Sequence, residues 1–104
     1  MTRPDLSRRA RYRIRFAKRG ALRYISVIDL TRGWERTLRR AGAPLLYSQG
    51  FNPRPQLHIA AGLPLGVEGR AEVMDAWLEG DGLPEPSALL ERLRRAAPDG
   101  LAIG

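Results

Sequence analysis

The chain of 104 residues contains no cysteine and a single histidine, His58. The lack of cysteine excludes disulfides, thiolate zinc sites, Cys-held iron–sulfur clusters and cysteine nucleophiles. One histidine cannot form a histidine metal cluster or a two-histidine acid–base pair within the chain. His58 alternates with Leu57 and Ile59, so we expect it on the solvent side of a strand rather than as a ligand. We therefore expect no metal site and no bound cofactor.

Long apolar runs and catalytic motifs are also missing. No stretch approaches the roughly 18 to 20 apolar residues that span a bilayer, and the segment 1–5 leads into arginines rather than into an apolar signal core. The expected location is therefore cytoplasmic, without membrane contact. There is no phosphate loop, no Gly-x-Gly-x-x-Gly and no Ser-His-Asp order. These absences predict a domain that is not an enzyme by itself.

The positive charge lies mainly in the first half of the chain. The formal net charge is +7, with 18 Lys and Arg against 11 Asp and Glu. Residues 1–54 have a net charge of +11 and residues 55–104 a net charge of −4. This polarity suggests a polyanionic partner for one end of the molecule. The other explanation is compositional, because Lys18 is the only lysine and an excess of arginine also follows from a GC-rich genome.

The first strand is predicted by alternation. Residues 1–10 have no apolar period and are expected to form a flexible basic tail before a single domain over 11–104. Tyr12, Ile14 and Phe16 should face the core. The intervening arginines should then share the opposite face of a sheet: Arg11, Arg13 and Arg15. After a break at 18–20, residues 21–25 are expected to resume the strand briefly.

An amphipathic helix is predicted over residues 26–41. Ser26 and Asp29 have the spacing of a capping box at its start, and this role explains Asp29 without general-base chemistry. Gly42 and Pro44 end the helix. The expected buried stripe recurs at helical spacing and consists of Val27, Leu30, Trp34, Leu38 and Ala41.

The remaining elements complete a ferredoxin-like pattern. The expected segments are a short strand over 45–47, a strand or strand edge over 57–61, a connection over 63–67, a strand over 72–78, a helix from 86 to 96 or 97, and the start of a strand over 101–103. In the 72–78 strand, the apolar set Met74, Ala76 and Leu78 should face the core. The order predicts an α+β fold, a ferredoxin-like α/β sandwich with two helices on one face of an antiparallel sheet.

Arginines and one stiff turn are the candidates for binding. Arginine suits phosphate because its planar fork donates two parallel hydrogen bonds. The candidate phosphate contacts are Arg11, Arg13, Arg15, Arg32, Arg36, Arg39 and Arg54. The candidate recognition turn consists of Tyr47, Ser48, Gln49, Gly50, Phe51 and Asn52. Alternatively, Tyr47 and Phe51 are core residues and the two amides satisfy the backbone of the turn.

Four segments resemble successive motifs of a known family. They are Arg23-Tyr24-Ile25-Ser26-Val27-Ile28-Asp29-Leu30, Leu38-Arg39-Arg40-Ala41-Gly42-Ala43-Pro44, Tyr47-Ser48-Gln49-Gly50-Phe51-Asn52-Pro53-Arg54-Pro55 and Leu63-Pro64-Leu65-Gly66-Val67-Glu68. Together they resemble the radical SAM-linked domain family of unknown function. The resemblance implies a radical SAM partner with a B12-binding-type domain, a nearby ribonuclease of the E/G type, and a full domain longer than this chain. It implies no activity. The family pattern has histidine where this chain has Val27, which weakens any catalytic hypothesis further.

Three hypotheses follow. The first is an accessory, non-catalytic domain that binds RNA, either tRNA or another structured RNA, for a radical SAM modification enzyme. The second is a protein-interaction module that docks on the radical SAM protein without contacting nucleic acid. The third is a domain that handles a small anionic molecule, which would require a concave pocket at the 48–55 turn.

Overall fold

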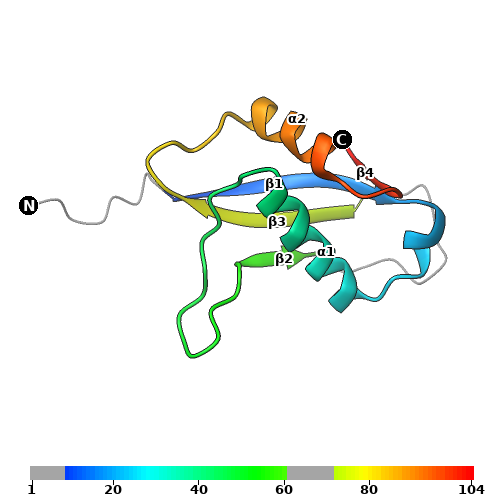
Figure 1. Ribbon diagram of the computed structural model, residues 1–104, viewed down its shortest axis with the longest axis horizontal. Coiled ribbons are helices and arrows are strands. Elements are labelled where there is room, and N and C mark those ends of the chain that lie inside the picture. The colour runs from blue at the N-terminus through cyan, green and yellow to red at the C-terminus, as the bar shows by residue number, and fades with distance from the viewer. Residues whose placement is uncertain (1–8, 61–71) are drawn as a thin grey trace, which may run out of the picture.

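The helices and strands follow the order β-α-β-β-α-β, which is the expected order without the short strand predicted over 45–47. The computed structural model describes residues 9–60 and 72–104, and Figure 1 shows their arrangement. The elements are β1 (Arg9–Lys18), the 3-10 helix η2 (Gly20–Tyr24), α1 (Val27–Arg40), β2 (Leu57–Ile59), β3 (Glu72–Glu79), α2 (Pro86–Ala96) and β4 (Leu101–Ile103).

The four strands form one sheet in the order β2-β3-β1-β4, with every neighbouring pair antiparallel. Both helices cover the same face of this sheet (Figure 1), and the other face has no helix over it among the described residues. The order, the antiparallel pairing and the one-sided helices together confirm the predicted ferredoxin-like α/β sandwich.

The core lies between the helices and the inner face of β1 and β3. Ile14 and Phe16 of β1 are buried, as the alternation predicted. Phe16 packs edge-on against Trp34 of α1, with ring centroids 5.2 Å apart, a favoured geometry for two aromatic rings. Other fully buried apolar side chains of this core come from β3, α1 and α2: Met74, Ala76, Leu78, Leu38, Leu89 and Leu93.

The first helix begins and ends where its capping residues predict. The backbone N–H of Asp29 donates to Oγ of Ser26 at 3.1 Å, and Gly42 follows the C-cap with φ of +74°. The predicted buried stripe is correct except for Val27, which is 54% exposed. Val27 lies in the first turn of α1, at the end of the helix that extends past the sheet in Figure 1.

Residues 21–25 do not resume a strand, so that expectation was wrong. Residues 21–24 belong to the 3-10 helix and Ile25 is its C-cap; Gly20 turns the chain with φ of +59°, and the N–H of Leu22 donates to the carbonyl of Arg19. The N–H of Arg19 in turn donates to the carbonyl of Gly100 at 2.7 Å. A Cβ on Gly100 would lie 2.5 Å from that Arg19 carbonyl oxygen, so the approach of the two turns requires glycine.

Other boundaries differ by a few residues. The strand β1 begins at Arg9, so Arg9 and Ala10 belong to the sheet rather than to the predicted tail. The predicted 45–47 strand forms only isolated bridges, from Leu45 to Leu78 and from Tyr47 to Pro55. The remainder of the tail, residues 1–8, and the connection predicted over 63–67 lie outside the described residues.

Candidate nucleic-acid interface

The arginines of β1 line the outer face of the sheet. We refer to Arg9, Arg11, Arg13 and Arg15 as the sheet-face arginines; all four are exposed. Arg13 lies opposite Asp75 in the register, and its Nε and Nη2 donate to the two carboxylate oxygens at 3.0 and 3.2 Å. Arg9 pairs with Glu79 at 3.3 Å. Half of this set is therefore occupied by carboxylates of the neighbouring strand.

Asp75 of β3 is the carboxylate that Arg13 contacts on the outer sheet face. Its side chain is buried, and the hydrogen bonds from Arg13 lower the pKa of its carboxyl, although burial opposes the shift. The positive charges of Arg13, Arg11 and His58 lower the pKa further. His58 itself is exposed in β2 opposite Asp75, which confirms the expectation of a solvent-facing strand residue.

A second set of arginines lies on the opposite side of the molecule, over the helices. Burial of Leu30, Trp34 and Leu38 turns the other side of α1 outward. The outward positions carry four exposed arginines: Arg32, Arg36, Arg39 and Arg40. Together with Glu35 and Arg54 they line a surface hollow of about 530 Å³.

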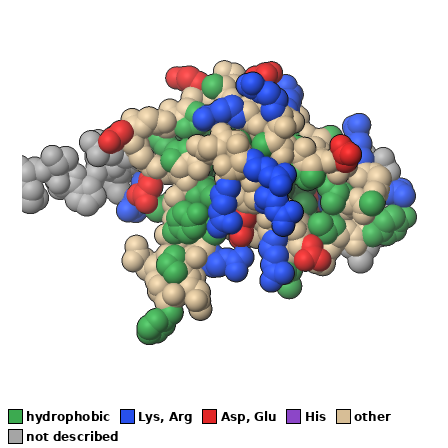
Figure 2. Space-filling view, viewed as in Figure 1, with side chains coloured by type: hydrophobic (Ala, Val, Ile, Leu, Met, Phe, Trp, Pro, Cys, Tyr) green, Lys and Arg blue, Asp and Glu red, His purple; other side chains and the backbone are tan. Residues whose placement is uncertain are grey.

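The second helix extends this basic surface. Arg92 and Arg95 of α2 line an adjoining hollow of about 520 Å³, and Arg40 borders both hollows. We call the combined set the helix-face arginine band: Arg32, Arg36, Arg39, Arg40, Arg54, Arg92 and Arg95. Figure 2 shows the basic side chains of this face gathered in a band over α2 and α1. Glu35 is the single acidic residue among the residues that line the two hollows.

Arg54 is the member of the band that comes from the loop between α1 and β2. Its Nη2 donates to both carboxylate oxygens of Glu35, at 3.2 and 3.1 Å. Glu35 is buried, whereas the Arg54 side chain is 57% exposed. The pair therefore attaches the loop to α1 and leaves most of the Arg54 guanidinium open to solvent.

The loop itself is a hairpin over residues 46–56. The N–H of Gln56 donates to the carbonyl of Leu46, and the N–H of Ser48 donates to the carbonyl of Arg54, both at 2.8 Å. The Oγ of Ser48 also accepts from the N–H of Arg54 at 3.1 Å. A hydrogen bond with the Tyr47 side chain raises the pKa of the Arg39 guanidinium, which ties the base of the hairpin to α1.

The tip of the hairpin consists of residues that the sequence suggested as a candidate recognition turn. Phe51 has a relative exposure of 105%, so the alternative that it is a core residue was wrong. Tyr47 is 39% exposed, and the neighbouring Gln49, Gly50 and Asn52 are exposed as well. In Figure 2 the hairpin is the projecting lobe at lower left, which ends in hydrophobic atoms. Nothing in the sequence alone shows that this aromatic lies at the end of a projection.

The candidate residues thus fall into two groups that do not meet. Arg11, Arg13 and Arg15 lie on the outer sheet face. The structure brings Arg32, Arg36, Arg39 and Arg54 together on the helix side, beside the base of the hairpin. Sequence reasoning missed Arg40, Arg92 and Arg95. Arg92 and Arg95 could have been found from their spacing of three residues in α2, which makes them neighbours on the helix surface.

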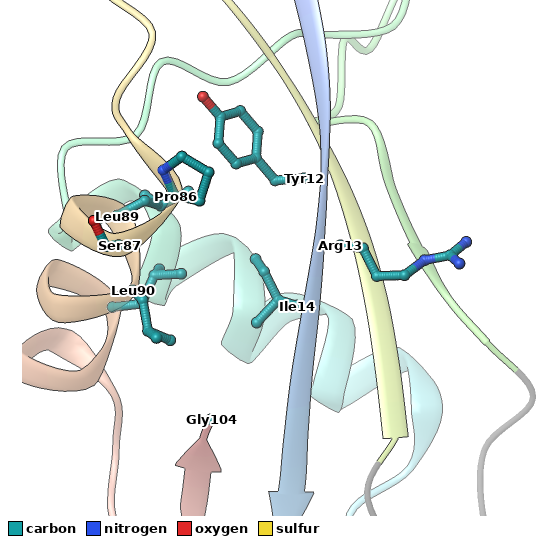
Figure 3. A pocket seen from close by; sticks show the side chains of 9 residues that line it. Tyr12, Arg13, Ile14, Pro86, Ser87, Leu89, Leu90 and Gly104 are labelled. Atoms are coloured by element: carbon teal, nitrogen blue, oxygen red, sulfur yellow. The ribbon is translucent and has the colours of Figure 1, made fainter.

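A small pocket of about 210 Å³ lies between β1 and α2, away from the hairpin. Its walls are mainly apolar, and Figure 3 shows Tyr12 and Ile14 of β1 facing Leu89 and Leu90 of α2 across it, with the Arg13 side chain directed away. The hydroxyl of Tyr12 donates to the carbonyl of Pro84 at 2.7 Å. Such a lining suits apolar groups rather than a small anion.

The remaining findings concern membrane-spanning helices and the comparisons with known proteins. No helix of the described residues is long and apolar enough to cross a membrane. No curated protein and no solved structure matches the chain. A family model described as "Uncharacterized protein conserved in bacteria (DUF2344)" matches residues 11–104. The chain therefore belongs to this conserved bacterial domain family.

Proposed function

We propose that this domain is a non-catalytic RNA-binding module whose contact surface is the helix-face arginine band. The observation that carries the proposal is the charge of this surface: seven arginines border two adjoining hollows with one acidic residue among them. Glu35 is bonded to Arg54. None of the other six guanidinium groups has a carboxylate within 4.0 Å among the described residues.

Phosphate is the ligand that such a surface suits best. A guanidinium group presents a planar fork of N–H donors that matches two phosphate oxygens, and it is more weakly hydrated than an ammonium group. A row of several such groups matches a backbone that repeats its charge at each nucleotide better than it matches a single small anion. Since the band spans two helices and a hairpin, we assign it to structured RNA, with tRNA as the first candidate.

The resemblance to the radical SAM-linked domain family supplies the setting of this proposal. In that setting the module holds an RNA substrate for a neighbouring radical SAM enzyme that has a B12-binding-type domain. The chemistry then belongs to the partner, and this chain contributes affinity and orientation.

The test is the binding of bulk tRNA over a range of salt concentrations. Each neutralised phosphate contributes roughly 0.7 to 0.9 to the slope of log K against log salt, so we expect a slope steeper than about −3. Absent binding, or binding that does not change with salt, would contradict the proposal. If the domain instead binds the radical SAM protein and nuclease treatment leaves that association intact, the band serves a protein interface.

A further inference from the structure

The hairpin between α1 and β2 holds an aromatic side chain away from the body of the domain. Phe51 has no cover from any described residue, since its exposure is 105%. A single exposed hydrophobic residue is common on protein surfaces and by itself indicates nothing. The position of Phe51 is what distinguishes it, because it lies at the end of a projection whose base is bonded to the helix-face arginine band.

The hairpin is built to keep that position. Its two sides are joined by backbone hydrogen bonds from Ser48 to Arg54 and from Gln56 to Leu46. Pro53 and Pro55 restrict the backbone on either side of Arg54. The Arg54–Glu35 pair then fastens the hairpin to α1. A side chain that is held in advance loses less conformational entropy when a ligand binds to it.

The residues next to Phe51 in the chain are exposed, and several of them are polar. Gln49 and Asn52 are exposed on either side of it, and their amide groups can donate to and accept from the edge of a base. A buried anchor of a protein interface would be expected within a larger apolar patch. An exposed phenyl ring with amide side chains close to it in the chain suits a flat, polar-edged ligand, as an unpaired nucleobase is.

We infer that Phe51 stacks on an unpaired base of the RNA whose phosphates bind the arginine band, with Gln49 and Asn52 at the edge of that base. The inference rests on the proposed function and specifies its substrate class: an RNA in which a helix adjoins unpaired nucleotides. A regular duplex does not offer this contact, because its bases are stacked on one another and its deep major groove is closed to side chains.

The experiment compares two RNAs that share one stem: a stem-loop with unpaired nucleotides and a fully paired duplex. We expect Phe51→Ala to weaken binding of the stem-loop about tenfold, within the range seen for base–aromatic stacking, and to leave the duplex affinity unchanged. Because Phe51 is fully exposed, this variant should fold normally. Phe51→Trp should bind the stem-loop about as tightly as the original chain does. Phe51→Leu, which is apolar but not aromatic, should bind it as weakly as Phe51→Ala does.

Each other outcome has a definite meaning. Unchanged stem-loop affinity in Phe51→Ala, an equal loss on both RNAs, or full rescue by Phe51→Leu would overturn the stacking inference. In these cases the proposed function still holds if Arg36→Ala/Arg95→Ala weakens both RNAs. If that double variant binds both RNAs as tightly as the original chain, the proposed function itself fails.

Discussion

The two basic faces of this domain use the same residue type in different ways. On the outer sheet face, Arg13 and Arg9 bond to carboxylates of β3. In the helix-face arginine band, only Arg54 has a carboxylate partner among the described residues. A carboxylate partner offsets the charge of an arginine, whereas six arginines of the band have no such partner among the described residues and leave that side of the domain strongly positive. The net charge of a chain therefore does not show which of its faces carries arginines without carboxylate partners.

The largest effect should come from reversing charge on the helix side. We expect Arg36→Glu/Arg95→Glu to weaken tRNA binding about a hundredfold near 0.1 M salt, because several phosphate contacts are lost and repulsion is added. The matched control is Arg11→Glu/Arg15→Glu, which changes the charge equally on the outer sheet face. Filter binding should show less than about a threefold change for this control. Equal losses in the two variants would show that RNA does not prefer the helix side to the outer sheet face.

A large loss of stability is expected when the buried ion pair on the inner side of β1 is broken. Lys18, the only lysine, is buried and lies 3.5 Å from the buried carboxylate of Glu72. Lys18→Met leaves that carboxylate without this cation, so the free energy of unfolding should fall by about 3 kcal/mol. Adding Glu72→Leu should recover most of the loss in urea unfolding. A stable Lys18→Met single variant would show that the ion pair does not matter to the fold.

A smaller loss of stability is expected when either partner of the Arg13–Asp75 pair is replaced, and the loss should differ between the two partners. Arg13→Ala leaves a buried carboxylate unpaired, whereas Asp75→Asn leaves an exposed guanidinium that water can solvate. We therefore expect the melting temperature to fall on the order of 5 °C for Arg13→Ala and less for Asp75→Asn. Arg36→Ala, on the helix side, should leave it unchanged. Thermal melts at neutral pH measure all three.

The Arg13–Asp75 pair also predicts a pH dependence. Because the pKa of Asp75 is lowered in the folded state from its ordinary value of 3.8, its contribution is complete above that value and is lost as the pH falls through the lowered pKa. The difference between the original chain and Asp75→Asn should therefore be constant near neutrality and disappear in acid. A difference that persists at the lowest pH would assign the effect to packing.

Local signals predicted most of the fold. Alternation identified both faces of β1 and β3, and Ser26, Gly42 and Pro44 bounded the first helix, because these signals act within a few residues. The exceptions, Val27 and the 3-10 turn, depend on where the sheet ends and on the close approach of Gly100 to Arg19. Neither is visible in a local pattern.

The candidate site could be predicted only in part. The turn around Phe51 was identified from its residues, but its projection depends on the attachment of Arg54 to Glu35. The sequence suggested arginines on both faces and could not divide them, since the division follows from helices that cover only one side of the sheet. Arg92 and Arg95 were missed because the second half of the chain has a negative net charge.

The most direct measurement is the salt slope of tRNA binding for two matched neutral variants. Each variant removes two exposed arginines: Arg36→Ala/Arg95→Ala on the helix side and Arg11→Ala/Arg15→Ala on the outer sheet face. If RNA binds the helix-face arginine band, the first variant should reduce the magnitude of the slope by about 1.5, and the second should leave it unchanged. A reduced slope for the sheet-face variant with an unchanged slope for the helix-face variant would contradict this account.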